Sequence, residues 1–147
     1  MLYTREGDNL VPATPAAQQL ATDYPTWPDK GPTIDGTRIS INSPQSHYRP
    51  SDPIHIVHAV EILTPGQDLH VMGPKPIHGE WVDDVLATDP PTPTPLIPPL
   101  YDGRVLPSPG VDTNYEVTTY TFTTPGTHTI QWRLGPLTSN LLTLKIS

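Results

Sequence analysis

The chain has 147 residues, a length typical of one domain, and a net charge of −7 from 15 acidic and 8 basic residues. The basic residues are scattered singly, which argues against a nucleic-acid partner, because phosphate binding draws on clustered Lys and Arg. Proline accounts for 21 residues and excludes most long helices, since each proline inside a helix costs about 3 kcal/mol.

Residues 1–37 are predicted to form an extended, proline-rich arm, because prolines interrupt every candidate element. A short helix over Ala13–Thr22 is the most that the pattern permits, with Pro15 near its first turn. Tyr24 and Trp27 are the large side chains of this arm. Each must be buried against its own domain or against a neighbouring protein. We favour a neighbour, because interfaces are rich in such aromatic anchors.

From residue 38 to residue 147 the sequence predicts short strands joined by turns rich in Pro and Gly. Alternation of apolar and polar residues indicates strands at Arg38–Ile41 and Ile54–Ile62, the second half-buried, with Ile54, Ile56 and His58 on one face. Such a series of strands is typical of a two-sheet sandwich. The other predicted strands are Asp68–Met72, Glu80–Leu86, Tyr115–Phe122, His128–Leu134 and Asn140–Ile146.

Residues 87–100 contain six prolines and favour polyproline II structure, so they are predicted to form an inserted loop. A loop of this length is usually functional or disordered. Leu96 and Ile97 in this loop, together with Trp81, Tyr24 and Trp27, are the predicted partner-binding residues. Trp132 lies on an alternating face and is predicted to belong to the core.

Two stretches carry a recognisable pattern: Ile39–Ile41 with the turn Tyr48–Ile56, and Pro125–Trp132 followed by Ser139–Leu144. They resemble the opening and the closing hairpin of bacterial and viral immunoglobulin-like sandwich modules. Gly126, His128 and Ile130 take the places of Gly, Tyr and Cys in the immunoglobulin corner, whereas Thr124 replaces its Asp. The Cys pair and the corner Tyr are missing. The resemblance covers about 45 residues and implies an architecture without a catalytic residue, because sandwiches host many functions.

Six histidines suggest a metal site only weakly. His70, Met72 and His78 form the one conceivable cluster for copper or zinc, since the first two share a strand face. His58 and His128 are predicted on core faces, with His128 linking sheet to loop as the corner Tyr would. Burial would place the folded pKa of such a histidine below its unfolded value.

No catalytic constellation stands out, so the protein is predicted not to be an enzyme and to need no cofactor. Asp83 and Asp84 are adjacent and would point to opposite faces of a strand, which prevents them from acting as a pair. The sequence lacks cysteine and a Gly-x-Ser-x-Gly motif, and Asp112-Thr113-Asn114 lacks the remaining ligands of a calcium loop.

These observations predict a structural subunit that decorates or builds an assembly, most specifically a phage or virus capsid decoration protein. Its partner would be another copy or a shell protein. Two alternatives stay open: a carbohydrate- or protein-binding module that uses Trp81 and the 87–100 loop, and a metal-binding sandwich of periplasmic type. The sequence shows no secretory signal and no apolar run long enough to cross a membrane. We therefore expect a virion or a cytoplasmic assembly, with an extracellular surface still open.

Overall fold

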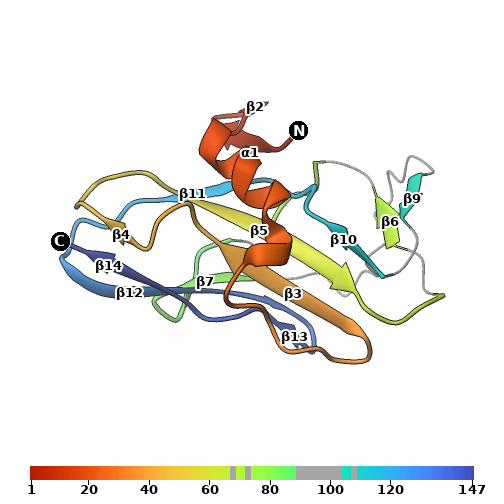
Figure 1. Ribbon diagram of the computed structural model, residues 1–147. Coiled ribbons are helices and arrows are strands. Elements are labelled where there is room, and N and C mark those ends of the chain that lie inside the picture. Colours follow the sequence, from red (N-terminus) through yellow and green to blue (C-terminus); the bar gives the residue numbers. More distant parts are fainter. Residues whose placement is uncertain (67–68, 72–73, 89–103, 107–108) are drawn as a thin grey trace.

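The computed structural model describes residues 1–66, 69–71, 74–88, 104–106 and 109–147. Short strands dominate this part of the chain, and its one α-helix is short, which confirms the all-β class (Figure 1). The predicted loop residues Leu96 and Ile97 lie outside the described residues.

The first large sheet is organised around one long central strand. This strand, β5 (Ile54–Ile62), pairs antiparallel along one edge with β3 (Thr37–Asn42). Its other edge pairs with β10 (Gly110–Asp112) near one end and with β11 (Thr118–Tyr120) near the other. The predicted strands at Arg38–Ile41 and Ile54–Ile62 are confirmed, whereas the strand predicted over Tyr115–Phe122 is shorter.

The second large sheet runs in the order β4-β14-β12-β7-β8, and β13 also pairs with β12. All of its pairs are antiparallel except β4 with β14, which is parallel. A separate pair joins β6 and β9. The bounds are β4 (His47–Tyr48), β6 (Leu69–Val71), β7 (Glu80–Val82), β8 (Val85–Leu86), β9 (Arg104–Leu106), β12 (Gly126–Leu134), β13 (Leu137–Thr138) and β14 (Leu142–Ile146).

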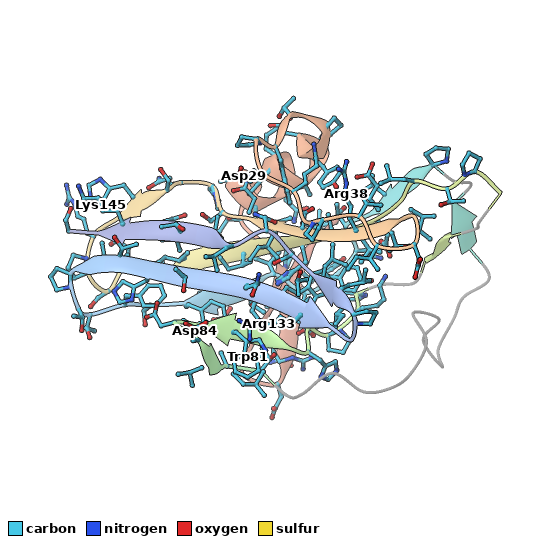
Figure 2. All side chains as sticks on the ribbon, turned by 90° about the horizontal axis from the view of Figure 1, so that it is seen from below. Asp29, Arg38, Trp81, Asp84, Arg133 and Lys145 are labelled. Carbon is cyan, nitrogen blue, oxygen red and sulfur yellow. The ribbon has the colours of Figure 1, made fainter. Side chains whose placement is uncertain are left out.

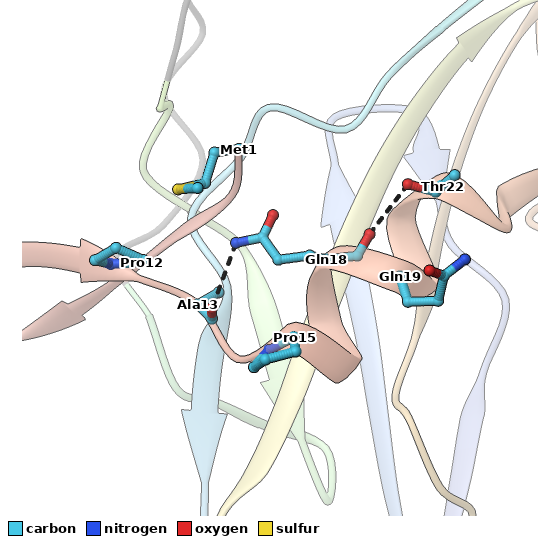
Figure 3. A pocket seen from close by; sticks show the side chains of 7 residues that line it. All are labelled: Met1, Pro12, Ala13, Pro15, Gln18, Gln19 and Thr22. Atoms are coloured by element: carbon cyan, nitrogen blue, oxygen red, sulfur yellow. Dashed lines mark hydrogen bonds between the residues drawn. The ribbon is translucent and has the colours of Figure 1, made fainter.

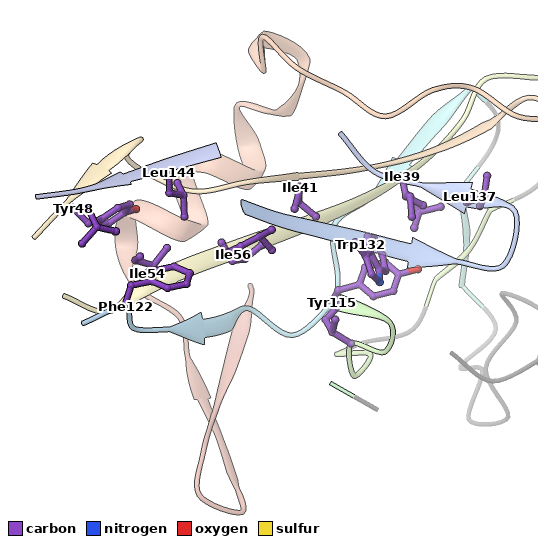
Figure 4. Packing of buried hydrophobic residues seen from close by; sticks show 14 of the residues in the cluster. Ile39, Ile41, Tyr48, Ile54, Ile56, Tyr115, Phe122, Trp132, Leu137 and Leu144 are labelled. Carbon is purple, nitrogen blue, oxygen red and sulfur yellow. The ribbon is translucent and has the colours of Figure 1, made fainter. Parts of the chain in front are cut away.

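The main core lies between the two large sheets, as Figure 4 shows. Alternate residues of β3 and β5 meet alternate residues of β12 and β14 there, as period-two patterning requires. Trp132 is 1% exposed, so its predicted core position is confirmed. The members that are at most 1% exposed are Ile39, Ile41, Ile54, Ile56, Val60, Ile130, Trp132, Leu144 and Ile146. Two sheets facing one core fit the description of a β-sandwich, and an immunoglobulin-like topology stays a prediction.

The segment predicted as one strand over Glu80–Leu86 is a hairpin. Asp83 and Asp84 have φ values of 49° and 63°, and they connect β7 to β8. Two consecutive left-handed residues form the tight turn that matches the twist of antiparallel strands, and Asp is among the residues that tolerate this region. The adjacent aspartates therefore mark a turn instead of opposite faces of a strand.

The N-terminal residues are folded, which corrects the prediction of an extended arm. They form the hairpin of β1 (Tyr3–Glu6) and β2 (Asn9–Pro12), helix α1 (Pro15–Thr22) and the 3₁₀ turn η1 (Tyr24–Thr26). The helix lies within the predicted range. Its N-cap is Thr14, whose side chain accepts a hydrogen bond from the backbone N–H of Ala17.

This N-terminal segment covers the outer face of β5 and builds a second apolar cluster there. The segment contributes Leu2, Ala13, Ala17, Tyr24 and Trp27, and the sheet contributes Val57, Ala59 and Val117. The predicted half-buried strand is therefore buried on both faces. The alternation of residues along β5 predicted one buried face, but it could not predict that a distant segment of the chain covers the other face.

Asn140 ties the second sheet to the free edge of β3. Its side-chain oxygen accepts a hydrogen bond from the N–H of Ile41 at 2.9 Å, and its side-chain nitrogen donates to the carbonyl of Ile41 at 3.0 Å. One amide side chain thus takes the place of a neighbouring strand at this residue. The preceding residue, Ser139, also has a structural role, since its Oγ accepts a hydrogen bond from the N–H of Trp132.

Candidate functional site

The most concentrated polar chemistry in the described residues is a buried network on Glu80. The Glu80 carboxylate extends from β7, and three donors from the opposite sheet converge on it. His58 Nε2 lies 2.5 Å from Glu80 Oε2. Thr118 Oγ1 and Tyr120 OH donate to Glu80 Oε1 at 2.5 Å and 2.6 Å. The side chains of His58 and Glu80 are both 0% exposed.

The electrostatics of this network favour an ionised Glu80. Burial alone would raise its pKa, but the charge of His58 and the hydrogen bonds from His58, Thr118 and Tyr120 together lower it below the usual value. Burial raises the pKa of Tyr120, and the adjacent carboxylate raises it further, so the phenol remains a donor. The Trp132 ring packs edge-on against the His58 ring, with 5.0 Å between centroids.

The location of the network decides what it can do. A substrate cannot reach two side chains that are fully enclosed between the sheets, so the pair does not form an accessible acid–base site. Because Glu80 belongs to one sheet and its three donors to the other, the network connects the two layers. Sequence analysis placed His58 inward but missed Glu80, Thr118 and Tyr120. One signal could have pointed to such a network: a histidine that faces the core requires a polar partner there.

A buried Lys–Asp ion pair lies beside β10. Lys75 Nζ is 2.7 Å from Asp112 Oδ2, and the two side chains are 8% and 3% exposed. Lys75 Nζ also lies 4.4 Å from the centre of the Tyr115 ring. Burial, followed by the charge of Asp112, raises the pKa of Tyr115. This pair joins the segment before β7 to the first sheet. Sequence analysis did not predict that these two residues would meet.

The predicted partner-binding aromatics of the N-terminal segment are anchored to this chain. Tyr24 and Trp27 are each 4% exposed. Tyr24 OH donates to Glu61 at 2.7 Å, and Trp27 Nε1 donates to the carbonyl of Leu20 at 2.9 Å. The structure thus shows burial against the chain's own domain, not against the neighbour that sequence analysis favoured, because the outer face of β5 offers apolar surface.

Trp81 lies on the outer face of the second sheet and is partly exposed. Figure 2 shows it beside Arg133 and Asp84. The Arg133 guanidinium lies 4.6 Å from the centre of the Trp81 ring and 3.5 Å from Asp84. One face of the indole is therefore occupied by a cation.

The proposed metal ligands do not come together in the described part of the chain. Met72 and the side chain of His70 lie outside the described residues, and His78 is partly buried with its carbonyl accepting from Trp132 Nε1 at 2.9 Å. No group of three His, Asp or Glu residues with metal-binding geometry is present among the described residues.

His128 performs the linking role predicted for it. Its Nδ1 lies 2.6 Å from Asp83 Oδ2 in the β7–β8 turn, and its Nε2 lies 2.8 Å from the carbonyl oxygen of Thr124. These hydrogen bonds raise the pKa of His128, with the bond to Asp83 making the largest contribution. The predicted lowering was wrong for this histidine, because a carboxylate partner outweighs the small burial effect.

The described surface includes two hollows, each lined in part by a terminal residue of the chain. One, of about 390 Å³, lies beside the hairpin and helix of the N-terminal segment and is lined by Met1, Pro12, Ala13, Pro15, Gln18, Gln19 and Thr22 (Figure 3). The other, of about 330 Å³, is lined by Gln45, His47, Tyr48, Arg49, Asp52 and Ser147.

The second hollow contains a serine–histidine contact. His47 Nε2 lies 2.5 Å from Ser147 Oγ. A hydrolytic triad would also need a carboxylate on the other ring nitrogen of the histidine. Asp52 accepts instead from the backbone N–H of Arg49 at 3.0 Å. Within the described residues no carboxylate contacts that nitrogen, so the contact does not form a triad.

Comparison of the chain with protein-family models, with curated proteins and with solved structures gave no significant match. The resemblance to immunoglobulin-like modules consequently rests on the two sequence stretches alone. The described residues contain no helix that is long and apolar enough to cross a membrane.

Proposed function

We propose that this protein is a non-enzymatic structural subunit whose partners are other proteins in a multi-subunit assembly. The observation that carries the proposal is the N-terminal hairpin, whose strand β1 contacts the sheet while its turn extends away from the sheets (Figures 1 and 4). Leu10 on this hairpin is 41% exposed, and Met1 at its base is 79% exposed. On a projecting ribbon these apolar side chains are available for contact with another protein.

Side-chain contact suits this hairpin better than the addition of a strand. The open strand β2 (Asn9–Pro12) has only four residues and ends on Pro12, which has no N–H to donate. The finer assignment to a phage or virus shell belongs to the same proposal and is supported by the sequence resemblance.

The carbohydrate-binding alternative has less support. Sugar rings stack on a free aromatic face, and Arg133 occupies one face of Trp81. The metal-binding alternative has no ligand cluster among the described residues.

The proposal is tested by light scattering on the full chain and on two matched variants. Leu10→Asp places a charge on the hairpin, whereas Leu141→Asp places one on another exposed leucine, 55% exposed and outside the hairpin. We expect the wild type and Leu141→Asp to give molar masses above the 16.1 kDa of one chain, and Leu10→Asp to give a lower mass. A wild type that stays at one chain mass at every concentration would overturn the self-association, and equal masses for the two variants would overturn the role of the hairpin.

A further inference from the structure

We infer that residues 1–27 are an exchangeable element, and that in the assembly this segment docks on β5 of a second copy of the same chain. The inference rests on the proposed function and names its partner. It starts from the separation of two apolar clusters. The segment contributes to the cluster on the outer face of β5 and not to the cluster between the sheets.

The segment carries its own internal hydrogen bonds, which would survive detachment. Gln18 clamps Leu2 in the way that Asn140 clamps β3: its Oε1 accepts from the N–H of Leu2 and its Nε2 donates to the Leu2 carbonyl, both at 2.7 Å. Trp27 Nε1 donates to the carbonyl of Leu20, and the rings of Tyr24 and Trp27 pack edge-on at 4.9 Å. The hairpin, helix and 3₁₀ turn therefore form one unit.

The acceptor surface is small, apolar and specific for this unit. Val57, Ala59 and Val117 supply its apolar part. Its polar margin binds the segment through the N–H of Val117, which donates to the Tyr3 carbonyl at 2.8 Å, and through Glu116, which pairs with Arg5 at 2.5 Å. A second copy offers the same apolar surface and the same polar margin, so an exchanged dimer keeps these contacts between unit and sheet.

The connection between unit and sheet has the features of a hinge. Gly31 is fixed against β3: its N–H donates to Ser40 Oγ at 3.0 Å, and a Cβ there would lie 2.0 Å from the carbonyl oxygen of Ile39. Only residues 28–30 separate Gly31 from buried Trp27. Trp27 has φ −59° and ψ 127°, an extended conformation, as expected before a proline. The chain therefore leaves the unit already extended, and a short connection between two docked parts invites exchange between copies.

The absence of cysteine from the sequence permits a direct test by disulfide trapping. Thr4 and Val117 are bridge partners across the boundary between unit and sheet, so Thr4→Cys with Val117→Cys places two thiols at a distance suited to a disulfide. The control combines Thr129→Cys with Thr143→Cys. These residues are register partners in β12 and β14, and both belong to the sandwich body of one chain. Both proteins are concentrated, oxidised, separated by size and analysed on non-reducing gels.

We expect the Thr4/Val117 pair to give covalent dimers within the dimer fraction, whereas the Thr129/Thr143 control gives single chains from the same fraction. Disulfides confined to single chains in a dimer fraction would overturn the exchange and leave the proposed function standing. A protein without any dimer fraction would overturn the exchange together with the self-association of the proposed function.

Hinge length provides a second measurement that does not depend on disulfide formation. Deletion of Pro28 and Asp29 shortens the reach of the connection by about 7 Å and should convert the protein to dimers. Insertion of Gly-Ser-Gly-Ser after Asp29 should remove the dimer fraction, because a long flexible connection favours docking within one chain. A dimer fraction that is the same in both variants and the wild type would contradict the inference.

Discussion

Replacement of Glu80 by glutamine tests the network that connects the two sheets. The substitution preserves size but removes the charge that accepts hydrogen bonds from His58, Thr118 and Tyr120. A hydrogen bond to a charged group contributes about 1.5–3 kcal/mol, and three such bonds are weakened together in this variant. We therefore expect Glu80→Gln to lower the free energy of unfolding by about 3–5 kcal/mol, a large part of the usual 5–15 kcal/mol.

The assay is denaturant unfolding followed by tryptophan fluorescence, since Trp132 packs against His58 and reports on this part of the core. Glu6→Gln is the matched control, because Glu6 is exposed at the end of β1. Tyr120→Phe removes one of the three donors and should cost about 1.5–3 kcal/mol, which keeps the test informative if Glu80→Gln fails to fold.

The pH dependence provides a second check on the same residue. The folded pKa of Glu80 is lowered, so its ionisation stabilises the fold above the ordinary value of 4.5, and this stabilisation is lost as the pH falls through the folded pKa. The wild type should therefore lose more stability than Glu80→Gln below about pH 4.5. Equal stability of the two proteins at pH 7, within about 0.5 kcal/mol, would refute the role of the network.

Three further outcomes are expected. Asn140→Ala should lower the free energy of unfolding by about 1–3 kcal/mol, measured by denaturant unfolding, because both backbone groups of Ile41 lose their partner; an unchanged midpoint would contradict this. Asp83→Asn should lower the pKa of His128, as measured by NMR titration. In the wild type, the raised pKa of His128 stabilises the fold below about pH 6.5, and this stabilisation should be lost as the pH rises through the folded pKa. Trp27→Ala should lower the free energy of unfolding by about 3–5 kcal/mol in denaturant unfolding, because the buried indole packs the N-terminal segment against β5. A change near zero would show that this segment is not docked.

The local pattern was sufficient for the strands that carry the core. The alternation of Ile54–Ile62 fixed both the limits of β5 and the inward face with Ile54, Ile56 and His58. The closing strand β12 and the core position of Trp132 followed from the same period-two rule. The N-cap and proline at the start of α1 explain why a short helix was also predictable within an otherwise irregular segment.

The candidate site was less accessible to sequence analysis, because its members are distant in the chain. Glu80 lies 22 residues from His58 and 40 from Tyr120, and no local signal associates them. Asp83 and Asp84 resembled part of a strand, because a tight turn of two left-handed residues interrupts the alternation only briefly.

The sequence by itself determined the all-β class, the main strands and the inward direction of their apolar residues, since these follow from propensity and periodicity along a single element. Only the tertiary structure decided that the N-terminal segment folds back over β5, that its aromatics are buried in this chain and that one carboxylate joins the two sheets. Those features depend on which surfaces meet. An apolar face or a buried charge is stabilised by whatever partner the fold brings to it, and that partner is not specified by neighbours in the sequence.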